Sequence, residues 1–298
     1  MRTPTLKLIL IFAFAICVLV PQHAEARRVK TQFTRVFDPS DIVTISIDCN
    51  DPGQVDQLYQ VNYIDQSNVI EIRLSGSCPA SVLAPVLRWK APVHYLGPAT
   101  IRGNYISDDP EEPDVVKHIV QFTDIHFNGQ YSDYSWLARD TLILDGVLAF
   151  ERCRFSGWGG DRILSVRPAY PFNPANLTLN SLVRLTEVVM VDVPVRGIYL
   201  DLAHEVRIDH ISITGAGFPL ISIYQDAATS DGLLTMTNSN FTTTGPSRWM
   251  PIVALNLAPI QTNSVAEISR NRFDSENGHG VNIALSAAAE DQKEPMRT

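Results

Sequence analysis

Six segments of the chain share one pattern of hydrophobic and polar positions. Hydrophobic residues occupy the first, third and eighth positions, and in four copies also the sixth, as in Val206–Ile213. Alternation with a period of two predicts β-strands, and the longer step in the middle predicts a sharp bend between two short strands. The segments begin at Val120, Leu148, Val183, Val206, Leu234 and Ala266.

The intervals between equivalent positions limit the size of the repeat. The eighth positions are 28, 35, 23, 28 and 32 residues apart. The shortest interval leaves no room for a β-α-β unit, which needs about 30 residues. A second hydrophobic run follows in most copies, for example Ile198–Leu202 and Ile221–Tyr224. Each repeat therefore supplies about three strands, and this favours a strand solenoid over a β-sandwich.

This arrangement resembles the right-handed parallel β-helix of the pectin-lyase-like superfamily, over roughly residues 66–286. The stretch Val69–Gly76, followed by Ala99–Gly103, is similar to the opening coils of exported members of that group. The resemblance implies an all-β fold, a right-handed parallel β-helix (solenoid). Its open end needs a cover, and Gly53–Ile64 is expected to be a short N-terminal capping helix.

The N-terminus has the features of a secretory signal. A basic start precedes the hydrophobic run Leu8–Val20, and Ala24 and Ala26 give the small-x-small cleavage pattern. The alternative, a membrane anchor, is disfavoured because this run is too short to cross about 30 Å of hydrocarbon. We expect a secreted or periplasmic protein with no membrane span. The expected parts are a signal peptide (1–26), an N-terminal strand and capping helix (27–65), the β-helix (66–286) and a disordered tail (287–298).

Three cysteines follow the expected signal peptide, and pairing is permitted outside the cytoplasm. Cys49 and Cys78 each close a strand-like run, and we predict a disulfide bond between them. Cys153 occupies the hydrophobic sixth position of its segment, which predicts a buried free thiol. Three free thiols are the alternative.

Composition and charge exclude several classes of protein. With 45% hydrophobic residues the chain is too apolar for long disorder, and 19 Pro and 16 Gly disfavour a coiled coil. The net charge of −8 disfavours nucleic-acid binding, because phosphate recognition needs a basic face. The same charge weighs a little against an acidic glycan as ligand.

The bend between the two strands is expected to collect charged residues. Equivalent residues of neighbouring coils lie about 4.8 Å apart, so one bend position forms a column along the stack. Its charges alternate in sign at first, which favours an exposed ladder of ion pairs over a catalytic site. The column contains Asp124, Arg152, Glu187, His210, Asn238 and Arg270.

Three longer loops, 130–141, 168–181 and 225–232, recur at one point of the coil and carry aromatic and charged residues. Aromatic faces stack on sugar rings and charged groups bind hydroxyls, so the loops favour a polysaccharide ligand. The alternative is that these aromatic residues pack within their own loops. The candidate substrate-binding residues are Tyr134, Trp136, Arg139, Tyr170, Tyr224 and Asp226.

An acidic insert, Asn104–Asp114, is the one candidate for Ca²⁺, because it carries several carboxylates. Its prolines and the absence of a ligand-spacing pattern favour a solvated acidic loop instead. We therefore expect neither a metal site nor a cofactor.

Catalytic motifs of the pectin-lyase-like group are matched only in part. Val206–His210 is similar to the W-I-D-H stretch of pectate lyases, but nothing after it matches the arginine base that follows in those enzymes. Gly278–Gly280 resembles the G-H-G of polygalacturonase-type hydrolases, which need two carboxyl groups. The candidate catalytic residues are Asp209, His210, Asp231 and His279.

Two functions follow from these observations. The first is recognition of an extracellular polysaccharide, extended to cleavage or modification if the protein is a polysaccharide lyase or a glycoside hydrolase. The second is a non-enzymatic structural or adhesion role at the cell envelope or surface. The incomplete catalytic motifs add weight to the second.

Overall fold

The structure is a computed structural model, and its described residues all belong to one compact unit, Ser40–Thr298. The expected signal peptide (1–26) and tail (287–298) lie outside the described residues, as does the acidic insert 104–114. The described stretches are 42–60, 69–83, 91–103, 115–116, 119–132, 143–144, 146–159, 162–166, 182–194, 196–201, 205–217, 219–224, 233–245, 251–257, 265–275 and 279–285.

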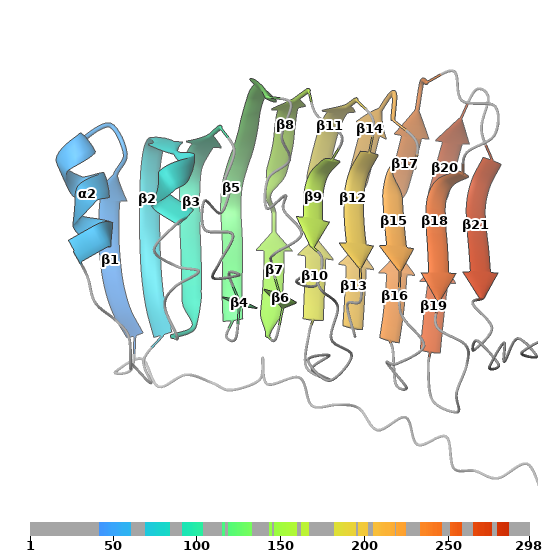
Figure 1. Ribbon diagram of the computed structural model, residues 1–298, viewed down its shortest axis with the longest axis horizontal. Helices are drawn as coiled ribbons and strands as arrows, with labels where there is room; N and C mark the ends of the chain where they lie inside the picture. Colours follow the sequence, from blue (N-terminus) through green and yellow to red (C-terminus); the bar gives the residue numbers. More distant parts are fainter. Residues whose placement is uncertain are drawn as a thin grey trace, which may run out of the picture. The chain divides into compact units, whose positions relative to one another are not determined.

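The strands stack coil upon coil, and the predicted parallel β-helix is confirmed (Figure 1). Every strand pair among the described residues is parallel, so the chain must cross over between paired strands. The first strands of the coils are β1 (Ile42–Asp48), β2 (Val69–Pro79), β3 (Val93–Arg102), β5 (Ile119–Ser132), β7 (Val147–Glu151), β10 (Leu182–Thr186), β13 (Glu205–Asp209), β16 (Leu233–Thr237) and β19 (Val265–Ser269).

The second strands belong to the same fourteen-stranded sheet, here called sheet A. They are β8 (Arg154–Trp158), β11 (Val189–Val193), β14 (Ser212–Gly215), β17 (Asn240–Thr243) and β20 (Arg272–Ser275), whereas β2, β3 and β5 continue through the bend as single strands. The third strands form a separate five-stranded sheet, here called sheet C. They are β9 (Arg162–Val166), β12 (Arg196–Asp201), β15 (Ile221–Tyr224), β18 (Pro251–Leu257) and β21 (His279–Leu285).

The register of the strands agrees with the repeat read from the sequence. Val206 pairs with Val183 on one side and with Leu234 on the other, which places three segment starts in one column. The same residues are buried, because they are the inward positions of each strand. In sheet C, Ile198 of β12 pairs with Leu164 of β9. The hydrophobic run of β9 begins at Ile163, so it is aligned with β12 from its second hydrophobic residue.

A left-handed residue forms each bend between the first and second strands. The six residues of the charged column have φ angles from 50° to 58°, which side chains other than Gly, Asn and Asp rarely adopt. One such residue turns the chain sharply, and the residue after it, such as Ile125 or Ile211, points into the core. The predicted column is therefore the corner of the coil.

Two polar residues take over the inward corner position in the last coils. Ser239 Oγ donates to the carbonyl of Thr237 at 2.7 Å and accepts from the amide of Ile211 at 3.2 Å. Asn271 donates to the carbonyl of Met236 at 2.7 Å and accepts from the amide of Ser239 at 2.9 Å. Backbone groups that the bend removes from the strand ladder are thereby satisfied by side chains.

The core is a column of stacked hydrophobic side chains. Phe122 and Phe150 stack with ring centroids 5.2 Å apart, and Phe127 and Phe155 stack at 4.7 Å. The two pairs meet edge to face, since Phe127 and Phe150 make an angle of 76°. Parallel in-register strands bring identical residue types together, which is why the aromatic rings form ladders.

A helix covers part of the first coil, as predicted. Helix α2 spans Pro52–Gln60, and residues 61–64 of the expected helix lie outside the described part. Asp51 accepts a hydrogen bond from the amide of Gly53 at 3.0 Å, and Pro52 suits the first helical turn, so this helix start is capped. Leu58 is fully buried against the core.

The cysteine predictions are confirmed. Cys49 and Cys78 form a disulfide bond that joins the residues after β1 to β2. Cys153 is a buried free thiol whose Sγ donates to the carbonyl of Glu151 at 3.4 Å. No helix in the described stretches has the length and hydrophobicity required to span a membrane. The remaining short elements are a 3₁₀ turn, η3 (Ala80–Leu83), and the strand pair β4 (Val115–Val116) and β6 (Ile143–Leu144).

Candidate functional site

Two tyrosines form an aromatic pair on sheet C. The rings of Tyr199 on β12 and Tyr224 on β15 have centroids 5.3 Å apart and are tilted by 37°. Tyr199 pairs in register with Ser222, and Asp201 pairs with Tyr224, so the two rings are diagonal neighbours on adjacent coils. Both tyrosines are partly exposed, whereas Ser222 is 2% exposed.

The pair has the chemistry of a sugar platform. A partly exposed tyrosine presents an apolar ring face and a phenolic hydroxyl, which can contact the CH face and the hydroxyl groups of a sugar. Tyr224 is one of the predicted substrate-binding residues. Tyr199 was missed, although its alternation with Ile198 and Leu200 marks it as an outward position of the same strand.

Most of the other predicted site residues lie outside the described part of the chain. This holds for Tyr134, Trp136, Arg139, Tyr170, Asp226 and Asp231. His279 is the first residue of β21 and pairs with Pro251 in sheet C. Asp209 and His210 belong to the corner of sheet A. The described candidates therefore divide between two sheets and do not form one site.

The corner residues form a compact polar cluster. The carboxylate of Asp209 accepts from Thr237 at 2.6 Å and from Asn238 at 2.9 Å, and it contacts His210 Nδ1 at 2.9 Å. Burial acts to raise the pKa of Asp209, but these hydrogen bonds outweigh it and lower the pKa to about 2. A carboxyl group with this pKa is already ionised near neutral pH, so it cannot serve as a general acid there.

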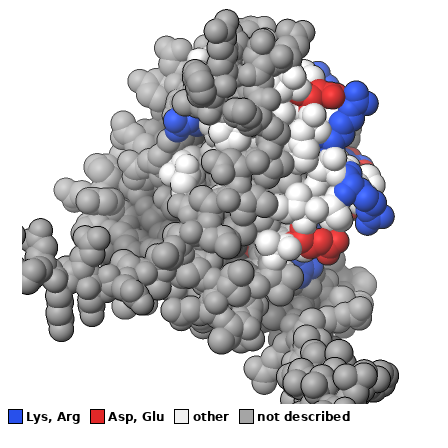
Figure 2. Space-filling model, turned by 90° about the vertical axis from the view of Figure 1, so that its right-hand side faces the viewer, with Lys and Arg blue, Asp and Glu red and all other residues white. Residues whose placement is uncertain are grey.

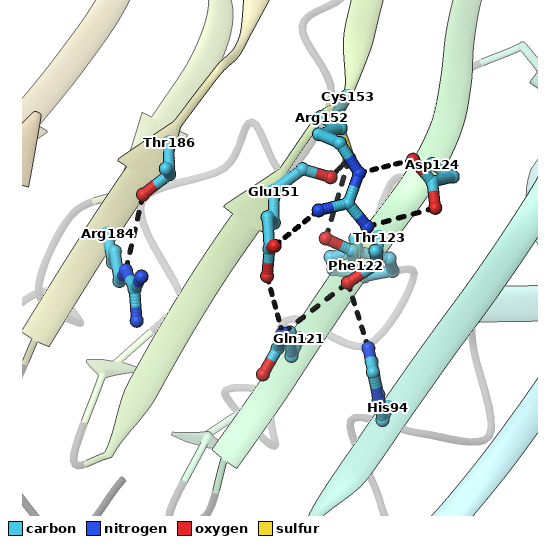
Figure 3. A network of polar contacts seen from close by, with 10 residues as sticks. All are labelled: His94, Gln121, Phe122, Thr123, Asp124, Glu151, Arg152, Cys153, Arg184 and Thr186. Atoms are coloured by element: carbon cyan, nitrogen blue, oxygen red, sulfur yellow. Dashed lines mark hydrogen bonds and ion pairs between the residues drawn. The ribbon is translucent and has the colours of Figure 1, made fainter. Parts of the chain in front are cut away.

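A second polar network crosses three coils of sheet A (Figure 3). His94 Nε2 lies 2.9 Å from Thr123 Oγ1, and Gln121 donates to that oxygen at 3.4 Å. Gln121 also donates to Glu151 at 3.3 Å. Arg152 completes the network by donating to Glu151 at 2.5 Å. Glu151 thus has two donors, one on its own coil and one on the preceding coil.

Burial and ion pairing shift the pKa values of the ionisable groups in this network. Burial lowers the pKa of His94, although Glu71 and Glu151 act in the opposite direction, so the imidazole is neutral near pH 7. A hydrogen bond from Arg152 lowers the pKa of Asp124. In return, Asp124 raises the pKa of the Arg152 guanidinium. These side chains hydrogen-bond and pair with one another, and a satisfied polar network of this kind makes the surface rigid.

Ion pairs along the strands reinforce this surface. Arg73 pairs with Glu71 and Arg207 pairs with Glu205, each two residues away on the same strand face. Viewed along the stack, most of the charged side chains visible among the described residues lie along one edge, where blue and red atoms are close to one another (Figure 2). The predicted ladder of ion pairs is formed in part. Arg152 pairs with Asp124 of the column and with Glu151, and these pairs do not include Glu187.

Within the described ranges, no three His, Cys, Asp or Glu side chains are grouped as they would be to hold a metal ion. Comparison of the chain with protein-family models, with curated proteins and with solved structures finds no match. The function must therefore be argued from the residues themselves.

Proposed function

We propose that the protein is an exported glycan-binding β-helix that holds an extracellular polysaccharide against sheet C without cleaving it. The observation that carries this proposal is the aromatic pair Tyr199–Tyr224. Two rings on adjacent coils offer a sugar chain neighbouring stacking surfaces, and their β-strands hold them in place. The same proposal takes the coil to be right-handed, as in the pectin-lyase-like superfamily and as parallel crossovers generally are.

Several features support binding over catalysis. The catalytic candidate Asp209 has a pKa of about 2 and is held by three neighbours. Glycoside hydrolysis needs a carboxyl group with a raised pKa, and a lyase needs a free base beside its substrate. Binding needs only an aromatic surface and hydroxyl groups, and the rings and phenolic hydroxyls of Tyr199 and Tyr224 on sheet C have this chemistry.

The alternative is a structural or adhesion protein that contacts other proteins. The interlocked network from His94 to Arg152 favours it, because internally paired side chains give a rigid face. Both proposals share the rod-like stack of coils. They differ in whether sheet C has affinity for sugar.

Affinity electrophoresis through gels that contain neutral and acidic polysaccharides tests the proposal. The wild-type protein is expected to be retarded by at least one polysaccharide, and Tyr224→Ala and Tyr199→Ala are each expected to weaken binding about tenfold, as loss of an aromatic contact does. Tyr224→Phe keeps the ring and is expected to retain most of the affinity. Arg272→Ala, an exposed arginine on β20 of sheet A, is the control and should bind as wild type.

Two results would overturn the proposal. One is a wild-type protein that no polysaccharide retards, which favours the adhesion role. The other is equal retardation of the wild type and of the double variant Tyr199→Ala/Tyr224→Ala. Reducing-end and unsaturated-uronate assays on the retained polysaccharide are expected to show no product, and a product formed by the wild type would identify an enzyme instead.

A further inference from the structure

An open depression of about 380 Å³ lies on sheet A, beside the corner of the early coils. Its volume falls within the range of about 300–1,000 Å³ that is typical of small-molecule sites. Three strands, β2, β3 and β5, contribute to its wall. The lining residues are Gly76, Pro98, Ala99, Thr100, Asp124 and His126.

Two polar residues of the wall, Thr100 and His126, lie in register, and Ser77 continues the same row on the preceding coil outside the lining. Ser77 pairs with Thr100, and Thr100 pairs with His126, so one residue comes from each of three adjacent coils. The coil spacing of about 4.8 Å separates Thr100 from His126, so the two side chains can contact one sugar ring or two adjacent ones. Ser77 Oγ is itself buried and does not line the depression.

The charged and ionisable groups of the wall are held in place for binding. Asp124 is fixed by two hydrogen bonds from Arg152, at 2.8 and 3.1 Å, and remains 47% exposed as an acceptor. His126 is fixed through Nε2, which lies 2.7 Å from Ser156 Oγ. Burial, followed by the charge of Arg154, lowers the pKa of His126, so its ring is neutral near pH 7.

The remaining wall is apolar. Pro98 and Ala99 lie beside the polar row, and Pro98 is exposed. A fixed carboxylate, a neutral imidazole and a threonine hydroxyl next to an exposed proline ring match a neutral sugar, which has hydroxyl groups on its edge and CH groups on its face. An anionic ligand fits less well, because Asp124 would repel it.

We propose that this depression is a second glycan-binding site, which takes one or two neutral sugar rings through Thr100, Asp124 and His126. The class of ligand rests on the function proposed above, whereas the site has its own residues and lies on a different sheet. With sites on sheet A and sheet C, one protein molecule would hold two glycan segments at once.

The site is tested by NMR of the histidine ring nitrogens in the full protein. The probes are the methyl glycosides of glucose, galactose, mannose and N-acetylglucosamine. The His126 signals are expected to shift saturably with at least one of them. Thr100→Val removes a hydroxyl and Asp124→Ala removes the carboxylate acceptor, and each is expected to weaken this binding about three- to tenfold. Ser212→Ala, an outward hydroxyl in the same column three coils away from His126, is the matched control.

The outcomes separate the two proposals. Absence of a saturable His126 shift with all four glycosides overturns the second site, whatever happens at sheet C. Unchanged affinity in both Thr100→Val and Asp124→Ala, with circular dichroism like that of the wild type, overturns it as well. Tyr224→Ala should leave the His126 shifts intact. Saturable His126 shifts without retardation by any polysaccharide would support the second site and contradict the function proposed for sheet C.

Discussion

Asp124 and Arg152 are 28 residues apart in sequence, yet the guanidinium donates two hydrogen bonds to the carboxylate, at 2.8 and 3.1 Å. Both residues are left-handed corner residues of adjacent coils, so the repeat itself brings them together. Asp124 also lines the depression on sheet A. The corner column therefore does two things: it turns the chain, and it sets the charges of the outer face.

The corner backbone predicts an unusual effect of glycine. Glu187 has a φ of 54°, a conformation that costs an L-residue about 1–2 kcal/mol. Glu187→Gly removes this strain and keeps the amide that donates to Asp209 O, against a backbone entropy cost of about 0.5–1 kcal/mol. The free energy of unfolding in urea is expected to rise by up to about 1 kcal/mol.

The neighbouring residue provides the control for this corner variant. Thr186 is the last residue of β10 and has an extended backbone, so Thr186→Gly should lower the free energy of unfolding by about 0.5–1 kcal/mol. Equal destabilisation by both substitutions would contradict a left-handed corner at Glu187.

The aromatic ladder predicts a large loss of stability on truncation. Phe127 is fully buried and stacks on Phe155 at 4.7 Å. Phe127→Ala leaves a cavity in this ladder and should lower the free energy of unfolding by about 3–5 kcal/mol in urea denaturation. Arg154→Ala, on the exposed side of the adjoining strand, should change it by less than about 0.5 kcal/mol. A loss below about 1 kcal/mol for Phe127→Ala would mean that this core is not close-packed.

The sequence predicted the coil well because the solenoid repeats one physical requirement. Most inward positions are hydrophobic, and stacking places equal positions in contact, so Phe127, Phe155 and Phe241 are found in one column of the pattern as in one column of the structure. The corner column was found for the same reason. The left-handed backbone conformation of this column was not predicted. Glycine usually indicates such a conformation, whereas the column contains Asp124, Arg152 and Glu187.

The candidate site was predicted less well because sugar binding leaves no periodic signal. Tyr224 was found through its position beside a long loop, whereas Tyr199 has the same spacing as any outward strand residue. Thr100 and His126 become neighbours only through the pairing of β3 with β5, and the register of this pair shifts between Leu96 and Ala99 of β3. Residue pairs that depend on register between irregular coils cannot be read from one sequence alone.

The disulfide bond is expected to stabilise the first coils. Cys49 and Cys78 are 29 residues apart, and closing a loop of this length stabilises the folded chain by about 3–4 kcal/mol in the chain-entropy model. Reduction should therefore lower the melting temperature, and amide exchange should lose protection first in β1 and α2. The double variant Cys49→Ala/Cys78→Ala should melt at one temperature with and without reductant. Unchanged melting after complete reduction, verified by thiol counting, would contradict this role.

The remaining described thiol should be inert in the folded protein. Burial raises the pKa of Cys153 to about 12, against weaker opposing hydrogen bonds from the backbone. Iodoacetamide reacts with thiolate, so at pH 8 Cys153 should be modified only after denaturation. Peptide mapping by mass spectrometry measures this, and rapid modification under native conditions would show that the corner opens.

Acid titration should reveal the cluster around Asp209. The pKa of this carboxyl is lowered from 3.8 to about 2 in the folded protein. The stability that comes from its ionised form is therefore present above pH 3.8 and is lost as the pH falls through about 2. Because the Asp209 side chain is 42% exposed, solvent screening keeps this contribution small.

Carbon-13 NMR of the carboxyl groups measures this pKa directly. Asp209 should titrate near pH 2 in the wild type, and Thr237→Val, which removes the 2.6 Å hydrogen bond, should move its pKa back toward 3.8. In melting experiments, the stability difference between the wild type and Asp209→Asn should shrink as the pH falls from about 4 to about 2. Titration of wild-type Asp209 near 3.8 would contradict the hydrogen-bonded cluster, because burial alone acts in the opposite direction.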